Sequence, residues 1–157
     1  MEYLILKWLH ILSSTFLFGT GVGSAFYKFL ADRTGNLQNI AQTNRHVVLA
    51  DWLFTTPTVI IQPVTGVMLA QLLGFPLSTP WLAASIALYI VTGLCWLPVV
   101  RLQMRMSTLS NDAVLKNVSL GDDYWRMTRQ WFWLGVPAFV AMVAIFYLMV
   151  LKPALWS

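Results

Sequence analysis

The stretch from Tyr3 to Phe29 reads YLILKWLHILSSTFLFGTGVGSAFYKF and decides the fold class. It is long enough to cross a bilayer, because a spanning helix needs roughly 20 mainly apolar residues at about 1.5 Å each. One side of this helix is nevertheless polar. Helical spacing collects on that side Lys7, His10, Ser14, Gly21, Ser24 and Lys28. We expect this side to face protein and the rest to face lipid.

The composition of the whole chain agrees with a membrane protein. The 157 residues are 58% hydrophobic and 10% charged, whereas soluble domains carry about 25% charged residues. We therefore predict one all-α domain, an integral membrane four-helix up-and-down bundle. The expected helices are approximately residues 3–30, 46–74, 81–103 and 123–151. The first helix is read as a span and not as a signal peptide, because its apolar run exceeds about 7 to 15 residues.

Two further helices carry polar side chains at helical spacing. In the second helix these are Asp51, Thr55, Thr58, Gln62 and Thr65, and in the third they are Ser85, Tyr89, Thr92 and Trp96. Three polar faces predict a partly polar interior, although Ser and Thr also serve as ordinary hydrogen-bonding glue between helices. The polar segments 31–45 and 106–122 are predicted to be solvent-exposed connections, and 75–80 a short hairpin.

Charge placement predicts the orientation of the chain. The segments around the first and third connections hold Lys28, Arg33, Arg45, Arg101, Arg105, Lys116, Arg126 and Arg129. The opposite side has only Lys7 and Lys152. By the positive-inside rule the two basic connections are cytoplasmic and both termini lie outside. A net charge of +4 without a basic stripe and interleaved aromatics argues against nucleic acid.

His10 is the leading candidate for function, because an ionisable group within the hydrocarbon is costly. A neutral imidazole in a helix bundle is suited to haem iron, and Lys7, one turn outward, to a porphyrin propionate. In the alternative, His10 only hydrogen-bonds Ser13, Ser14 or a facing helix. His46 adjoins a connection near the opposite membrane face, so the two histidines are not expected to clamp one iron. The side chains expected at the same depth in the membrane as His10 are Met68, Met149 and Tyr147. One of these could be the second iron ligand, unless they only pack.

Two other features have competing interpretations. Asp51 could pair with Arg45, Arg101 or Arg129 as a structural latch, or relay protons. Gly19 and Gly23 form a GxxxG pair that predicts close helix packing. The single Cys95 excludes a disulfide framework and a thiolate metal cluster.

Several segments together resemble the HemJ family of bacterial membrane proteins. These are YLILKWLHI at the start, TTPTVIIQPVTGVML in the second helix, WLAAS at the start of the third with Arg101 at its end, and Arg129, Pro137 and Lys152-Pro153 near the end. The resemblance implies a bundle that binds haem b and oxidises protoporphyrinogen, with His10 as the iron ligand. The chain departs from that family by having Ser85 where it has a lysine, and Leu134-Gly135 where it has Asn-Glu.

The expectation is therefore a HemJ-like redox protein of a bacterial inner membrane that acts on a porphyrinogen or exchanges electrons with a quinone. Its cofactor site would comprise His10, as the metal ligand, with Lys7, Ser14, Met68 and Tyr89. The alternative is a haem-free membrane subunit or small-molecule carrier that depends more on Asp51, Gln62 and Tyr89 than on His10. A purely structural assembly partner is the third reading, and a homodimer is compatible with so small a bundle.

Overall fold

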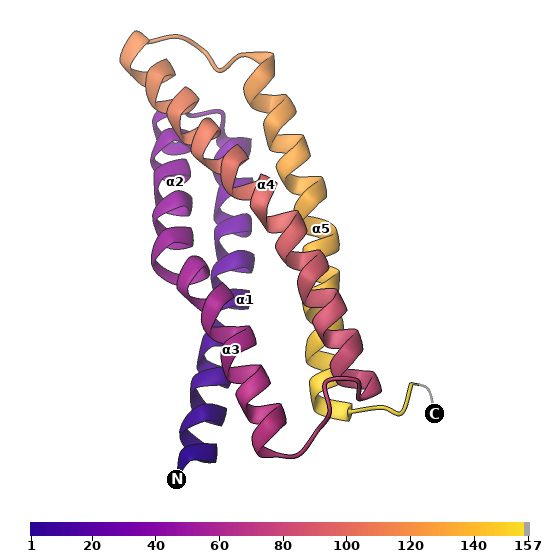
Figure 1. Ribbon diagram of the computed structural model, residues 1–157. Helices are drawn as coiled ribbons and strands as arrows, with labels where there is room; N and C mark the ends of the chain where they lie inside the picture. Colours follow the sequence, from indigo (N-terminus) through magenta and orange to yellow (C-terminus); the bar gives the residue numbers. More distant parts are fainter. Residues whose placement is uncertain (156–157) are drawn as a thin grey trace.

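The computed structural model describes residues 1–155 and is built from long helices (Figure 1). Their bounds are α1 Glu2–Thr34, α2 Leu37–Ala50, α3 Thr56–Leu72, α4 Pro80–Lys116 and α5 Asp122–Leu151. A short π-helix, η1 Asp51–Thr55, joins α2 to α3 without a break. Within the described residues, four helical segments are therefore long and apolar enough to cross a membrane. The predicted all-α four-helix membrane bundle is confirmed.

The two polar segments that we expected to be loops are largely helical. Only Gly35 and Asn36 separate α1 from α2, where Gly35 adopts φ 65° and the Asn36 side chain accepts a hydrogen bond from Asn39 N at 3.0 Å. Likewise α4 continues to Lys116 and ends at Asn117, which has φ 51°. The prediction was wrong because helices that leave the membrane no longer need apolar exteriors, so polarity alone does not mark their ends.

These extensions carry their own buried residues at helical spacing. In α2 they are Ile40, Ala41, Asn44 and Val47, and in the extension of α4 they are Met106, Ser110 and Ala113. Ile40 and Met106 pack with Tyr124 and Trp131 of α5 into one core cluster. The bundle is therefore held together beyond the membrane as well as within it.

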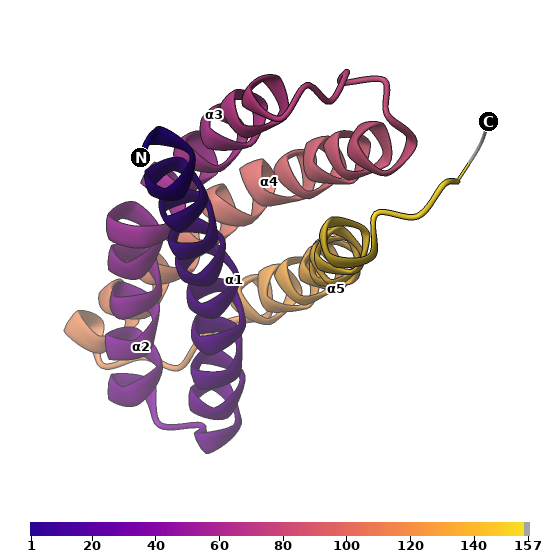
Figure 2. The same ribbon diagram turned by 90° about the horizontal axis from the view of Figure 1, so that it is seen from below.

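The helices form two groups that meet at one end of the bundle. α4 and α5 pack against each other along their lengths, while α1 packs against α2 and α3. Figure 2 shows the same grouping from below. Both termini lie at one end of the molecule, which we call the terminal end (Figure 1). The other end holds the α1–α2 and α4–α5 connections, and we call it the basic end.

A bend separates α2 from α3 at η1 (Figure 1). There the Thr56 N–H donates to Asp51 O, an i to i+5 hydrogen bond. Pro57 follows in the first turn of α3 and has no N–H to continue the normal ladder. Such π-turns often lie at functional sites, and this one turns Asp51 and Thr55 into the bundle, where each is buried.

Candidate functional site

His10 is pinned against α3 by hydrogen bonds to both ring nitrogens. Its Nδ1 lies 2.9 Å from Thr65 Oγ1 and its Nε2 lies 3.1 Å from Gln62 Nε2. The Thr65 hydroxyl donates to Ile61 O at 2.8 Å, and Ser13 donates to Gln62 Oε1. These donors are consistent with a neutral imidazole that has its proton on Nδ1 and accepts from the Gln62 amide at Nε2.

A close approach of α1 to α3 makes this arrangement possible. A Cβ added at Gly66 would lie 3.1 Å from His10 Cε1. Gly66 therefore leaves the space that the imidazole ring fills. Of the two sequence interpretations of His10, hydrogen bonding to a facing helix is the one that the structure shows.

The arrangement does not fit a haem-iron ligand as it stands. Iron would need the Nε2 or Nδ1 lone pair, and the neutral amide of Gln62 already uses Nε2. Within residues 1–155 no group of three or more His, Cys, Asp or Glu side chains is placed to hold a metal ion. Iron binding by His10 stays a prediction, and it requires that the Gln62 side chain turn away.

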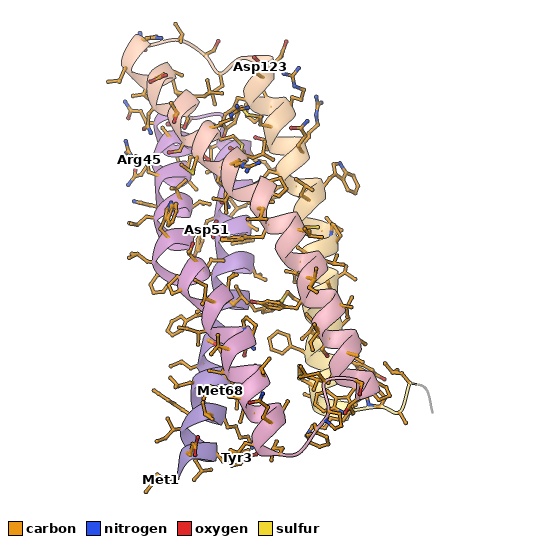
Figure 3. All side chains as sticks on the ribbon, in the orientation of Figure 1. Met1, Tyr3, Arg45, Asp51, Met68 and Asp123 are labelled. Atoms are coloured by element: carbon orange, nitrogen blue, oxygen red, sulfur yellow. The ribbon has the colours of Figure 1, made fainter. Side chains whose placement is uncertain are left out.

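None of the other predicted cofactor residues is hydrogen-bonded to the His10 ring, whose partners in the described chain are Thr65 and Gln62. Lys7 is exposed, with its Nζ 5.7 Å from the centre of the Tyr3 ring. Ser14 donates to Ile11 O at 2.8 Å, and Met68 is 41% exposed. Figure 3 shows Met68 and Tyr3 in the terminal half of the bundle, away from Asp51.

The remaining histidine and the two other proposed axial ligands are also elsewhere. His46 is exposed on α2, and Tyr147 is 60% exposed on α5. Met149 packs beside the cluster of Ala70, Trp81 and Leu82. The predicted axial pairing with His10 is therefore not assembled.

Tyr89 lies in a different place, where a proline positions it. Pro63 has no N–H, so the carbonyl of Val59 one turn earlier lacks its helical donor. The Tyr89 hydroxyl donates to Val59 O at 2.8 Å and so joins α4 to α3. A carbonyl inside a membrane must be satisfied within the protein, and this need places the Tyr89 ring on the wall of a cavity.

The cavity has a volume of about 400 Å³ and lies between α1, η1, α3, α4 and α5. Most of its wall is apolar, and its polar groups are few: Ser24, Asp51, Thr55, Tyr89, Thr92, Trp96, Gln103 and Trp131. It reaches the outside between α1 and α5, because its lining residues Val22, Phe132 and Phe139 are 41%, 48% and 49% exposed. An apolar cleft with a few convergent polar groups is the usual form of a small-molecule site.

At the polar end of the cavity Asp51 is bound by an amide and not by an arginine. The Gln103 side chain, in the orientation that satisfies both neighbours, donates to Asp51 Oδ2 at 2.6 Å and accepts from Trp131 Nε1 at 3.2 Å. Asp51 and Gln103 are 6% and 5% exposed. The predicted latch with Arg45, Arg101 or Arg129 is wrong, since among the described residues Asp51 forms no ion pair. Arg45 instead donates to Asn111 Oδ1 at 3.0 Å.

Two buried donors at this end face the Asp51 carboxylate without forming a hydrogen bond of normal geometry. Thr55 Oγ1 and Trp96 Nε1 lie beside the Asp51 carboxylate. Neither forms a hydrogen bond of normal geometry with any residue from 1 to 155. Most buried polar groups are hydrogen-bonded, and each exception calls for an explanation such as a missing ligand or water. Both residues line the cavity, and their polar atoms are enclosed, so a polar ligand head would bond to them once the side chains turn toward it.

Three glycines from three helices create the apolar part of the cavity. Gly21, Gly93 and Gly135 line it, and a Cβ added at any of them would meet no atom within 4 Å. Gly19 and Gly23 also have open space at Cβ. No helix of the described bundle packs closely on this GxxxG pair, so the predicted close packing is not found within one chain. Both glycines lie outside the cavity lining.

The depth of the cavity suits an amphiphile. Counted from the terminal ends of their helices, Asp51 and Gln103 lie about 31 to 34 Å along the axis and Tyr89 about 13 Å. The hydrocarbon core is about 30 Å thick. With the terminal ends of α3 and α4 taken as one membrane boundary, these distances put the polar end of the cavity near the opposite boundary and its apolar part toward the bilayer centre.

A second polar cluster, which sequence reasoning missed, joins four helices at the basic end. Lys28 of α1 donates to Asp32 at 2.9 Å, Asn44 of α2 at 3.1 Å and Tyr124 of α5 at 3.1 Å. Asn44 Nδ2 in turn donates to Ser110 Oγ of α4 at 3.0 Å. Lys28 is 1% exposed. The burial of Lys28 confirms its predicted place on the protein-facing side of the first helix, and its i, i+4 spacing to Asp32 was a usable signal for the ion pair.

A family model described as "Predicted integral membrane protein (DUF2269)" matches residues 4–153. No curated protein and no solved structure matches the chain. The matched model shows no link to HemJ proteins, so that resemblance stays a prediction.

Proposed function

The chain belongs to the DUF2269 family of predicted integral membrane proteins, and we propose that it binds a lipophilic small molecule in the cavity between α1 and α5. The ligand has an apolar body and a hydroxyl- or carbonyl-bearing head, as membrane quinols and quinones do. On this proposal the protein is a haem-free carrier or membrane subunit.

One observation carries the proposal. The buried Asp51 carboxylate, with the unpartnered Thr55 Oγ1 and Trp96 Nε1 beside it, stands at the interfacial end of an apolar cavity. A quinol hydroxyl both donates and accepts hydrogen bonds, so it can donate to Asp51 and accept from Trp96. The apolar body then fills the space left by Gly93 and Gly135.

The side opening supports access from the bilayer. Phe18 of α1 stacks on Phe139 of α5 with ring centres 5.6 Å apart, and it meets Phe146 edge to face at 5.3 Å. These rings join the two helices at the margin of the cavity nearest the terminal end. On the basic-end side of this bridge the lining residues Val22 and Phe132 are 41% and 48% exposed, so a lipid-soluble ligand can enter between α1 and α5 there without crossing water.

We further propose that the chain lies in a bacterial inner membrane with both termini outside. The support is the concentration of lysine and arginine at the basic end. A periplasmic reporter enzyme fused to the C-terminus is expected to be active, and a reporter that is active only in the cytoplasm would reverse this orientation.

The test of function is a pair of leucine substitutions. Gly135→Leu places a side chain in the cavity, whereas Gly19→Leu places one in open space outside its lining. Binding of decylubiquinol and decylubiquinone to the detergent-purified protein is followed by tryptophan fluorescence quenching, because Trp96 and Trp131 line the cavity. We expect saturable quenching in the parent and in Gly19→Leu, and at least about tenfold weaker affinity in Gly135→Leu, which corresponds to about 1.4 kcal/mol. Equal quenching in all three proteins would mean simple partitioning and would refute the site.

An absorption spectrum separates this proposal from the haem prediction. Oxidised and dithionite-reduced spectra are recorded for the parent and for His10→Ala, both expressed with adequate haem supply. A parent without b-type bands, also after haemin addition, is the expected result. Sharp reduced bands that vanish in a folded His10→Ala variant would overturn the haem-free reading and return His10 to the role of iron ligand.

A further inference from the structure

A groove separate from the cavity runs between α4 and α5 at the basic end. It is lined by Pro98, Arg101, Arg105, Gln130, Trp133 and Leu134, among others. We propose that this groove binds the phosphate headgroup of an anionic phospholipid, with the acyl chains lying along its apolar part. The proposal does not depend on the ligand of the cavity, because the two sites share no lining residue.

The groove lies at the depth of a lipid headgroup. Arg101 is about 31 Å along α4 from its terminal end, and Gln130 is about 31 Å along α5 from its terminal end. Because the hydrocarbon core is about 30 Å thick, both side chains reach the same membrane boundary. Trp133 is 69% exposed and lies one turn deeper on α5, as expected for a residue of the interfacial aromatic belt.

The charges of the groove are free to bind a ligand. Arg101 and Arg105 are one helical turn apart, so they project from the same face of α4. Neither side chain forms a hydrogen bond or ion pair with any residue of the described chain, and no acidic residue lines the groove. By contrast Arg126 is paired with Asp123 at 2.7 Å. Two unpaired guanidinium groups next to an amide at a membrane boundary match the geometry of a phosphate ester.

The shape of the groove favours a lipid over a soluble phosphate. Pro98 and Leu134 extend its wall from the arginines toward the bilayer centre, where an acyl chain would lie. Basic pockets between spanning helices on the cytoplasmic side are typical sites for anionic lipid headgroups. General attraction of the whole basic end to an anionic surface is the competing explanation, and the experiment is designed to separate the two.

The experiment measures lipid retention by native mass spectrometry. Protein purified in mild detergent is titrated with palmitoyl-oleoyl phosphatidylglycerol or with the matching phosphatidylcholine. The test variant is Arg101→Gln with Arg105→Gln, and the matched control is Arg33→Gln with Lys116→Gln, which removes the same charge from the basic end outside the groove. Each variant is compared after its melting curve matches that of the parent, and Arg101→Gln alone replaces the pair if the pair does not fold.

We expect the parent and the control to retain phosphatidylglycerol at least fivefold more tightly than phosphatidylcholine, and the groove variant to lose this preference. Inorganic phosphate at 10 mM should not displace the lipid, and displacement would show that the groove binds free phosphate instead. An equal loss of the phosphatidylglycerol preference in the groove variant and in the control would show diffuse charge attraction and would overturn the proposal. An unchanged preference in the groove variant would also overturn the proposal.

Discussion

The two buried polar clusters of this protein are built from similar residue types but differ in how completely they are hydrogen-bonded. Around Lys28, the ammonium group, the Asp32 carboxylate, the Tyr124 hydroxyl and the Asn44 amide all find partners within the bundle. Around Asp51, the Thr55 hydroxyl and the Trp96 indole N–H lie beside the carboxylate but form no hydrogen bond of normal geometry with any described residue. The first cluster faces packed protein, and the second faces a cavity.

The difference separates stabilising groups from candidate binding groups. A fully satisfied buried network joins helices, and its members cost stability when they are removed singly. A partly satisfied network carries a desolvation cost that a ligand can recover. Substitutions in the two clusters should therefore have opposite effects on stability. The next three predictions test this, and a fourth compares the buried ion pair with an exposed one.

The largest effect is expected for Lys28→Ala. It leaves Asp32 buried without its cation, and breaking a buried ion pair costs about 3 to 5 kcal/mol. Thermal unfolding in detergent should show a large loss of stability. The double variant Lys28→Met with Asp32→Leu removes both charges and should lose less than Lys28→Ala alone. A greater loss in the double variant would mean that packing, and not the unpaired charge, dominates at this position.

Ser110→Ala should have an intermediate effect. Ser110 is fully buried, accepts from Asn44 Nδ2 and donates to Met106 O at 2.8 Å. Its removal leaves an amide hydrogen of Asn44 with fewer acceptors and should cost about 1 kcal/mol. Chemical denaturation followed by circular dichroism measures the change. Ser24→Ala is a suitable control, because Ser24 bonds only to its own helix at Gly21 O, and it should be nearly neutral.

Thr55→Val should not lower the free energy of unfolding as Ser110→Ala does. The substitution keeps the shape of the side chain and removes a hydroxyl that is buried without a partner. Without ligand, the free energy of unfolding should stay within about 0.5 kcal/mol of the parent or rise. The affinity for decylubiquinol should fall in the same variant. Destabilisation equal to that of Ser110→Ala would show that Thr55 already has a partner.

The smallest effect is expected for Arg126→Ala. The Arg126–Asp123 pair is 2.7 Å long and the buried Lys28–Asp32 pair is 2.9 Å long, but the side chains of Arg126 and Asp123 are 66% and 76% exposed. Exposed pairs contribute about 0 to 1 kcal/mol, and salt screens them. The melting temperature should change little at any ionic strength. A loss comparable to that of Lys28→Ala would contradict the view that burial decides the contribution of an ion pair.

Much of the fold could be read from the sequence because membrane insertion depends on composition. Long apolar segments of about 20 residues must become helices in lipid, so the bundle and its polar inner faces were predictable. The buried set Asp51, Thr55, Thr58 and Thr65 confirms the predicted face of the second span. The ends of the helices were not predictable in this way, since polar residues beyond the membrane fit a helix as well as a loop.

The site was predicted less well, for reasons visible at single residues. His10 was singled out because an ionisable side chain is energetically costly in lipid. Which hydrogen bonds its ring nitrogens form, however, is decided by Gln62, Thr65 and Gly66 on another helix. Gly19 and Gly23 matched a packing motif, yet Gly135 and Gly93, which match none, shape the cavity. A motif is local in sequence, whereas a cavity is the volume that the side chains of several neighbouring helices leave unfilled between them.

The sequence by itself thus determined the membrane location, the number of spans and which helix faces turn inward, because each follows from the transfer of one segment between water and lipid. Tertiary structure alone decided which inward polar groups meet and which remain unpartnered. That outcome depends on the bend at η1, on Pro63 releasing the Val59 carbonyl for Tyr89, and on how far α1 lies from α5. These are relations between helices, and no single segment carries them.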